Sequence, residues 1–227
     1  MTQKQKIDFE KRREMILDTV SPLFAEKGCS VTTKELAAAA GISEALIYKH
    51  FKSKSELFEA VKTRCCKNVH PVAERLLQKA EAKERLPLSI VLLAHAVHVG
   101  FEEDLLPKKE MHKLVLQSLA AKGDFAVETF SNFGKWICPI SEDMTEGQRE
   151  GWLKKTPFSN EELLWMVHHF IVGMAFTLMP EKKMEVFDVD AVEIVEKCSL
   201  QGLVMLGMDI EEAAVESKKA LKEFKNL

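Results

Sequence analysis

Side chains that can bind nucleic acid are concentrated in one short stretch of the chain. Hydroxyl, imidazole and ammonium groups occur in this stretch at Tyr48, Lys49, His50, Lys52 and Lys54. Such groups donate hydrogen bonds to phosphate oxygens, which accept a large share of all protein–DNA hydrogen bonds. Thr33, at a predicted helix N-terminus, can offer its hydroxyl and backbone N–H groups to a further phosphate. We therefore expect a phosphate-binding surface between residues 33 and 54.

Three residues in this stretch have two interpretations each. Tyr48 is either a phosphate contact or a surface aromatic residue that packs on its own helix. His50 either binds a phosphate or braces the ring of the neighbouring Phe51. Glu44 either accepts a hydrogen bond from a cytosine amino group or only stabilises a helix N-terminus. The sequence leaves these alternatives open.

Helix-start signals predict that this stretch folds as a helix-turn-helix. Thr32 and Glu35 form a capping box, as do Ser53 and Glu56, and such pairs mark helix N-termini. Ser43 caps a further short helix. The helices expected here span residues 7–27, 34–40, 44–50 and a longer segment from 54. Short helices joined by a turn that contains glycine are typical of a helix-turn-helix.

The helix over 44–50 is the element expected to read bases. A helix fits the major groove, and the N-terminal residues of a recognition helix reach the base edges. The residues expected at this end are Ser43, Glu44, Ala45 and Leu46. Because Ala45 and Leu46 are apolar, we expect base recognition to depend on methyl contacts and DNA shape.

Composition predicts an all-α protein. The 227 residues are 46% hydrophobic and 30% charged, which excludes a wholly disordered chain. Only ten Gly and seven Pro occur, and Ala, Leu, Glu and Lys are frequent, with ten Met; all five of these residue types favour helices. Residues 1–68 carry 13 Lys and Arg against 9 Asp and Glu, and the remainder carries 19 against 26. A basic N-terminal part suits a polyanionic partner, although this excess is small enough to arise by chance.

The sequence predicts a cytoplasmic protein with no membrane partner. Its five Cys show no CxxC motif and no zinc-finger spacing, as is typical of reduced thiols. No apolar stretch follows the first basic residues, and the longest apolar run, 170–179, is too short to span a bilayer. GxGxxG, P-loop, GxSxG and HExxH motifs are absent. We therefore expect no enzyme activity and no cofactor.

The rest of the chain is predicted to form a helical bundle. The expected helices span residues 72–84, 87–105, 108–122, 124–137, 159–179 and 189–208, followed by an amphipathic segment to about 224. Pro87, Pro107 and Gly123 mark the expected boundaries. Residues 139–158 are expected to form a loop with a turn or two of helix. Pro22 is expected to kink the first helix or to end it early.

Residues 13–61 resemble the DNA-binding domain of the TetR family of bacterial transcriptional repressors. The resemblance rests on Ile16-Leu17, LFAEKG at 23–28, Thr32-Thr33, LAAAAGIS at 36–43 and IYKHFKSKSELFEAV at 47–61. It implies an N-terminal three-helix DNA-binding domain over 1–53 and a helical-bundle effector-binding and dimerisation domain over 54–227. The chain departs from the family at Ala45, where glycine is frequent, and at Leu46, where a hydrogen-bonding residue would read bases.

The resemblance also implies a function. It indicates a ligand-responsive repressor that binds a palindromic operator in double-stranded DNA as a dimer and is released by a small, mainly apolar effector. The residues expected to line the effector pocket are His95, His98, His112, Trp136, Trp165 and His168. The apolar stretches 163–179 and 189–208 are the expected dimer helices. A helical enzyme, or a protein-interaction adaptor, with an accessory nucleic-acid-binding head is the alternative.

Two further groupings have an ordinary structural explanation as their alternative. His95, His98 and Glu102 lie at i, i+3 and i+7, a spacing that metal ligands on one helix face can use. Core or surface positions explain such a spacing equally, and we expect no metal. Cys65 and Cys66 are adjacent and form a candidate redox sensor, but no neighbouring residue is evident that would lower a thiol pKa.

Overall fold

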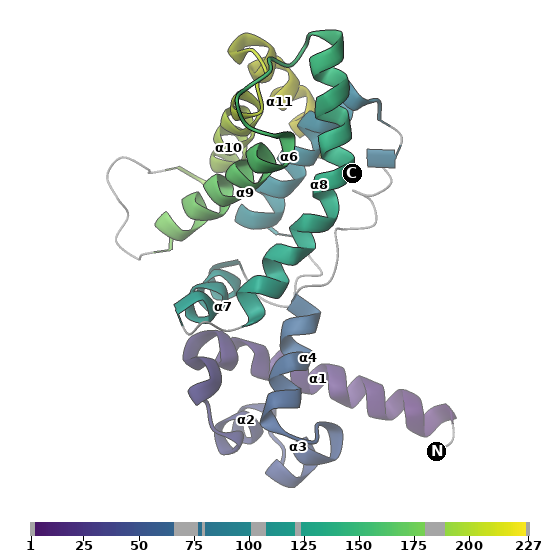
Figure 1. Cartoon of the computed structure of the whole chain (residues 1–227). Coiled ribbons are helices and arrows are strands. Elements are labelled where there is room, and N and C mark those ends of the chain that lie inside the picture. Colours follow the sequence, from purple (N-terminus) through teal and green to yellow (C-terminus); the bar gives the residue numbers. More distant parts are fainter. Residues whose placement is uncertain are drawn as a thin grey trace. The chain divides into compact units, whose positions relative to one another are not determined.

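The computed structural model describes residues 3–65, 77–78, 80–100, 108–120, 124–179 and 189–225. Every regular element in these ranges is a helix (Figure 1). The elements are α1 (Gln3–Lys27), the 3-10 turn η1 (Gly28–Ser30), α2 (Thr33–Ala40), α3 (Glu44–His50), α4 (Lys54–Cys65), α6 (Ala82–His98), α7 (Lys108–Ala120), α8 (Asp124–Glu150), α9 (Asn160–Thr177), α10 (Ala191–Met205) and α11 (Ile210–Lys225). The predicted all-α fold is confirmed.

The chain forms two compact units, each assembled from separate parts of the sequence. The first contains Met1–Lys67 and Glu103–Phe130, and the second contains Asn68–Glu102 and Ser131–Leu227. Helix α7 and the first residues of α8 therefore belong to the same unit as the helix-turn-helix. The domain boundary expected at residues 53 and 54 falls within the first unit, at the start of α4.

The first unit is organised by the apolar face of α1. Ile16, Leu17, Val20 and Phe24 recur along this face, and each is at most 3% exposed. Helix α1 contacts α2, α3, α4 and α7. Fully buried side chains of the surrounding elements are Val31, Leu36, Ile47, Phe51, Leu57 and Val61. A single core thus holds the short helices of the helix-turn-helix.

Of the two outcomes expected at Pro22, a kink or an early end of the first helix, the early end does not occur. Helix α1 continues past Pro22 to Lys27. A proline inside a helix removes one backbone hydrogen bond. The flanking side chains of Val20, Phe24 and Ala25 are nevertheless completely buried. Burial of this apolar surface holds the segment helical on both sides of the proline.

Helix α7 caps the C-terminal end of α1. Nε2 of Gln117 donates hydrogen bonds to the carbonyl oxygens of Ala25 and Glu26, each at 3.3 Å. Gly28 follows with a φ of +57°, and a Cβ atom there would lie 2.9 Å from Oε1 of Gln117. The last carbonyls of a helix have no partners within it. The Gln117 amide therefore satisfies two of them, and glycine leaves room for it.

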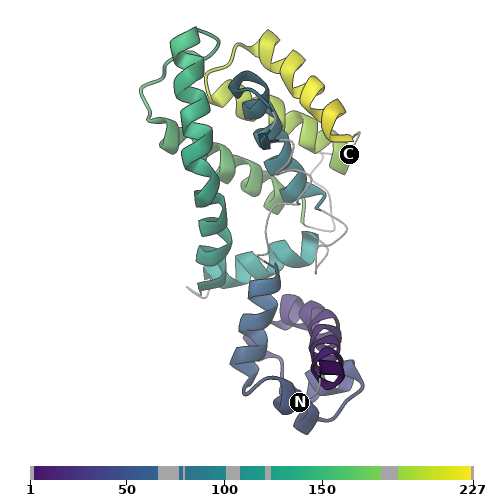
Figure 2. The ribbon, with the colours of Figure 1, turned by 90° about the vertical axis from the view of Figure 1, so that its right-hand side faces the viewer.

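Helix α6 is the central helix of the second unit. Its residues 86–92 are all buried. It contacts α9, α10 and α11, which lie around it in Figure 2. A Cβ atom on Gly202 of α10 would lie 2.9 Å from Ile90 and 3.2 Å from Val167. Gly202 thus permits α10 to approach α6 and α9 closely.

The helix boundary expected at Pro87 is wrong. Helix α6 begins at Ala82 and continues through Pro87, which is itself buried. The proline lies near the N-terminal end of the helix, where it removes a single backbone hydrogen bond. The burial of the residues that follow stabilises the helix by more than this loss.

The prediction of a loop over residues 139–158 is also wrong for the first half of this segment. Helix α8 continues through Pro139 to Glu150. The buried apolar side chains along this part are Ile137, Ile140 and Met144. Pro139 faces solvent, so the apolar face of α8 is uninterrupted while the proline occupies the outer face.

The C-terminal helices follow the predictions more closely. Helix α9 begins after a capping box, in which Ser159 accepts a hydrogen bond from the Glu162 backbone and the Glu162 carboxylate accepts one in return. Helix α10 covers most of the expected 189–208, and α11 forms the expected amphipathic segment. None of the described helices is long and apolar enough to cross a membrane.

A buried ion pair joins α6 to α8. The Arg85 guanidinium donates two hydrogen bonds to the Asp143 carboxylate, one of them from Nε at 2.8 Å, and a third to the Ala80 carbonyl oxygen at 2.8 Å. The side chain of Asp143 is 2% exposed, whereas that of Arg85 is 33% exposed. The hydrogen bond to Asp143 raises the pKa of Arg85. The carboxylate therefore depends on Arg85 for most of its solvation.

We expect Arg85→Met to destabilise the chain more than Asp143→Asn. The first change leaves a buried carboxylate without its partner, at a cost of about 3–5 kcal/mol. The second leaves an arginine that still reaches water. Urea unfolding of the full chain, followed by circular dichroism, measures both. Equal losses of stability in the two variants would contradict this asymmetry.

Candidate functional site

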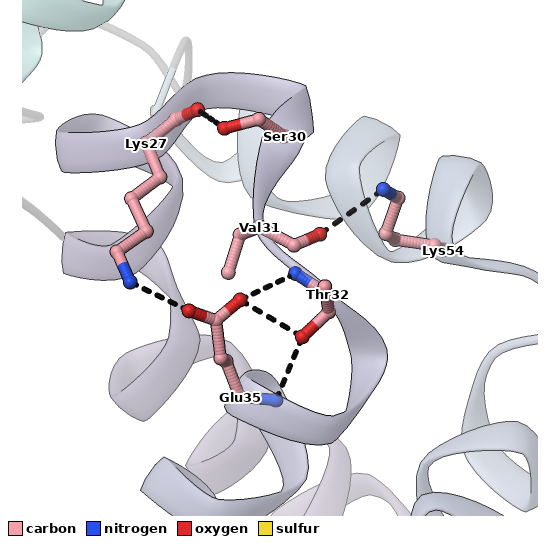
Figure 3. Close-up of polar contacts among 6 residues, drawn as sticks. All are labelled: Lys27, Ser30, Val31, Thr32, Glu35 and Lys54. Atoms are coloured by element: carbon pink, nitrogen blue, oxygen red, sulfur yellow. Dashed lines mark hydrogen bonds and ion pairs between the residues drawn. The ribbon is translucent and has the colours of Figure 1, made fainter.

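The N-terminal end of α2 is fixed by the predicted capping box. Oγ1 of Thr32 accepts a hydrogen bond from the Glu35 backbone at 3.2 Å, and Oε2 of Glu35 accepts one from the Thr32 backbone at 2.8 Å. Nζ of Lys27 lies 2.6 Å from Oε1 of the same carboxylate (Figure 3). The hydrogen bond from Lys27, followed by those from Thr32, lowers the pKa of Glu35 to about 2. The box therefore remains intact at neutral pH.

Lys54 connects α4 to the segment that precedes α2. Its Nζ donates a hydrogen bond to the Val31 carbonyl oxygen at 3.0 Å (Figure 3), and the side chain is half-buried. The ammonium group thus lies beside the N-terminal end of α2, where it positions the backbone. Its expected phosphate contact remains a prediction.

Thr33 and Tyr48 bring the two helices of the motif together. Their hydroxyl groups lie 3.0 Å apart, with Thr33 at the first position of α2 and Tyr48 on α3. Tyr48 is 46% exposed. Each hydroxyl can donate one hydrogen bond and accept others. The pair therefore presents a donor at the open surface, next to the backbone N–H groups of the α2 N-terminus.

The start of α3 is available for contacts with a partner. Ser43 caps the helix, because its hydroxyl accepts a hydrogen bond from the Leu46 backbone at 3.2 Å. Glu44 and Ala45 are exposed, and Leu46 is half-buried. The turn before it contains Gly41 in the left-handed region, with a φ of +63°, which glycine adopts without strain. The structure thus positions the predicted base-reading residues at an exposed helix end.

His50 lies on the opposite, buried side of α3. His50 is 8% exposed, and its ring stacks on the Phe9 ring with the centroids 4.3 Å apart. Burial, followed by the positive charges of Lys49, Arg12 and Arg13, lowers the pKa of His50. The imidazole is therefore neutral at pH 7. Of the predicted phosphate-binding residues, His50 has the least access to a partner, while Lys49 is exposed.

Phe9 and Arg13 contact the motif, although sequence reasoning did not select them. Arg13 donates a hydrogen bond to the His50 carbonyl oxygen and lies over the Phe51 ring, 4.0 Å from its centroid. Its Nη2 atom is 3.9 Å from the Glu56 carboxylate. The sequence feature that could have identified Phe9 and Arg13 is their i, i+4 spacing, which places both side chains on one helix face.

In the second unit, an aromatic cluster connects α8 and α9. The His168 ring stacks on Phe133 at 4.4 Å, and Trp165 meets Phe133 edge-on at 5.3 Å. His168 is 4% exposed. Burial lowers the pKa of His168 to about 4, and the nearby His169 adds to this shift. The cluster joins two of the predicted pocket residues, Trp165 and His168.

The two histidines of α6 point to different helices. Nε2 of His98 lies 3.6 Å from Sγ of Cys198 on α10, whereas the His95 ring packs against Phe224 of α11 at 4.5 Å. Burial lowers the pKa of His98 to about 4, although a backbone hydrogen bond at Ile171 opposes the shift. Burial also raises the pKa of the Cys198 thiol to about 11. The His98–Cys198 pair packs against the core of the second unit.

No metal site is evident in the described ranges. No group of three or more His, Cys, Asp or Glu residues gathers there in a way that could hold a metal ion. Glu102, the third residue of the predicted spacing, lies outside the described residues, as do Cys66 and the side chain of Cys65. The metal and redox interpretations of these residues therefore gain no support.

The six predicted pocket residues are divided between the two compact units. His112 lies on α7 in the first unit, and the other five lie in the second. Trp136 packs against the apolar core of α6 and its neighbours. A surface hollow of about 330 Å³ between α8 and α9 is lined by Cys138, Ser141, Glu142, Thr145, Glu146, Arg149 and Glu161. Apart from Cys138 its lining residues are of polar or charged types, and none of them is a predicted pocket residue.

The N-terminal segment matches a known family. Residues 16–61 fit the sequence profile described as bacterial regulatory proteins, tetR family. The chain is 42% identical over 62 residues to the HTH-type transcriptional regulator AcrR of Shigella flexneri, a match that covers 27% of this chain and 29% of AcrR. The similarity to this relative thus spans less than a third of its length.

Solved structures are similar in fold over most of the chain. A protein from Saccharomonospora viridis, solved in complex with choline, has a TM-score of 0.62 at 20% identity, covering 83% of this chain and 94% of that one. AibR, solved with isovaleryl coenzyme A and operator DNA, has a TM-score of 0.59 at 17% identity, covering 87% and 100%. The predicted helix-turn-helix followed by a helical domain is confirmed.

We expect the stability of the chain to fall as the pH decreases from about 6.5 toward 4, partly through His168. The unfolded histidine binds a proton near pH 6.5, but the folded one does so only near 4. Protons thus favour the unfolded state in this window. His168→Phe should reduce the loss between pH 7.5 and 5 by on the order of 1–2 kcal/mol.

The exposed neighbour on the same helix provides a matched control. His169→Gln removes an imidazole at the surface of α9 and should leave most of the pH-dependent loss in place. Urea unfolding at the two pH values measures each variant. If His168→Phe and the unmodified chain lose the same stability on acidification, His168 does not carry the effect.

Proposed function

We propose that the chain, whose residues 16–61 match the tetR family of bacterial regulatory proteins, is an effector-responsive DNA-binding repressor of that family. The observation that carries the proposal is the exposed hydroxyl pair of Thr33 and Tyr48. It lies between the N-terminal end of α2 and the exposed start of α3. Phosphate oxygens and base edges are the partners that such a surface fits.

Each polar residue of the motif has a proposed role in DNA binding. Thr33, Tyr48 and Lys49 bind backbone phosphates, because they are accessible donors on one surface. Ser43 and Lys54 hold the helix ends in position and are proposed to share these phosphates. The residues proposed to face the bases are Glu44, Ala45 and Leu46. Glu44 is the one among them that can accept a hydrogen bond from cytosine.

The second unit is proposed to bind a small, mainly apolar effector and to form the dimer. The aromatic cluster of Phe133, Trp165 and His168 would supply an apolar lining with the ring nitrogens of Trp165 and His168 as polar groups, as ligand sites do. Effector binding would lower operator affinity only if the effector prefers the DNA-incompetent state. The S. viridis protein with choline and AibR with isovaleryl coenzyme A support a small molecule as partner.

Two copies are proposed to pair through the stretches 163–179 and 189–208. Met166 on α9 is 41% exposed and Val192 at the start of α10 is 50% exposed. A Cβ atom on Gly173 would meet nothing within 4 Å, so a second helix could approach α9 closely there. Symmetric pairing of helices is the usual route to a dimer that reads two half-sites.

We expect Tyr48→Phe to weaken binding to all duplexes by about 3–10-fold, because one hydrogen bond to phosphate contributes about 0.5–1.5 kcal/mol.

We expect Lys49→Gln to reduce the slope of the logarithm of the DNA-binding constant against the logarithm of the salt concentration by about 0.9 per monomer. Fluorescence anisotropy with the full chain and a labelled duplex, between about 50 and 200 mM salt, measures both.

Lys218→Gln, an exposed lysine on α11, is the matched control and should change neither quantity. Absence of salt-dependent DNA binding by the unmodified chain would contradict the proposed function. It would favour the alternative of a protein-interaction adaptor.

We expect Met166→Asp to raise the dimer dissociation constant at least tenfold, about 1.4 kcal/mol, because it buries a charge in the proposed interface. Sedimentation velocity of the full chain at micromolar concentration measures this. Val127→Asp is the control, since Val127 is 64% exposed but lies in the first unit. A monomeric unmodified chain, or equal effects of both variants, would exclude this interface.

A further inference from the structure

Helix α1 extends well beyond the part of the chain that matches the family. The matched segment begins at residue 16, whereas α1 begins at Gln3, and its first turns project beyond α2, α3 and α4 in Figure 1. Phe9 lies on this extension and stacks on His50, with the centroids 4.3 Å apart and the ring planes at 30°. The extension is therefore packed against the proposed recognition helix.

Arg13 fixes the direction of the same extension. It follows Phe9 by one helical turn, donates a hydrogen bond to the His50 carbonyl oxygen and covers the Phe51 ring. A cation at the C-terminal end of a helix is favoured by the free carbonyls there. Phe9 and Arg13 thus attach successive turns of α1 to one end of α3.

This attachment places an exposed guanidinium near the C-terminal end of α3. Arg12 follows Phe9 by three residues, so it lies on the same side of α1, and it is exposed. Arg12 and Lys49 both act electrostatically on the buried His50 ring, with Glu10 opposing them. Two exposed cations from different helices therefore flank the same neutral imidazole.

We propose that the N-terminal extension of α1 is a second DNA-contacting element, in which Arg12 binds a backbone phosphate adjacent to the one reached by Lys49. The inference rests on the proposed DNA-binding function. A guanidinium donates paired hydrogen bonds that match phosphate geometry. It also supplies, at this end of α3, the positive charge that the buried and neutral His50 does not.

The partner is the sugar-phosphate backbone and not the bases. Arg12 lies beside the C-terminal end of α3, whereas base edges are reached from the N-terminal end of a recognition helix. Its contact should therefore extend the footprint along the backbone without changing sequence preference. An acidic protein surface is the other partner that this charge could fit, and the experiment separates the two.

The test uses the full chain and a labelled duplex across a range of salt concentrations. Arg12→Gln should weaken binding about 3–10-fold at low salt and reduce the salt slope by about 0.9 per monomer. Arg12→Lys should restore most of the slope, because it keeps the charge. Two duplexes of unrelated sequence should show the same loss.

Lys11→Gln is the matched control. Lys11 carries the same charge and is also exposed, but it lies on the side of α1 away from Phe9. It should leave affinity and slope within about twofold of the unmodified chain, as expected for a charge outside the contact. Equal losses of DNA affinity in Lys11→Gln and Arg12→Gln would show that the effect comes from the net charge of the chain and not from a contact of Arg12. This result would overturn the inference.

The outcomes distinguish this inference from the function on which it rests. If the unmodified chain binds DNA and Arg12→Gln binds identically, the second element does not exist, while the proposed function stands. If the unmodified chain binds no duplex at any salt concentration, the proposed function itself fails. Phe9→Ala adds an independent measurement: it leaves every charge in place but removes the stack on His50, and it should weaken binding with an unchanged melting temperature of the second unit.

Discussion

The short helix α3 depends on α1 for its position. Seven residues make too few backbone hydrogen bonds for a helix to be stable alone. Ile47 is fully buried on one side of α3, and Arg13 binds the carbonyl oxygen of its last residue. These two contacts with the core and with α1 determine which residues of α3 face outward. Tyr48 and Lys49 are exposed because Ile47 and His50 are buried.

The neighbouring helix α2 is held by a charged network of the same kind. Glu35 bridges Lys27 and Thr32, and Lys54 binds the carbonyl oxygen before the helix. Both networks lie at helix ends, where backbone groups lack partners within the helix. Their combined result is the 3.0 Å approach of Thr33 and Tyr48, on which the proposed function depends.

Local signals predicted the helix starts well, because capping boxes such as Ser159–Glu162 act within one turn. Predictions from proline failed at Pro87 and Pro139, since burial of the flanking side chains outweighs a single lost hydrogen bond. The stack of Phe9 on His50 joins residues far apart in the sequence, and no local pattern specifies such a partner. For the same reason, the membership of His112 in the first unit was not predicted.

The division of the chain also limits how an effector could act. The chain passes between the units after Lys67, Glu102 and Phe130, and the third passage lies within α8, a continuous helix from Asp124 to Glu150. Under the proposed function, a tenfold loss of operator affinity requires a preference of about 1.4 kcal/mol between two states. By reciprocity, operator DNA must weaken effector binding by the same factor. Helix α8 is a covalent connection for this coupling; within the first unit, hydrogen bonds from Gln117 of α7 reach the end of α1, the helix that positions α3.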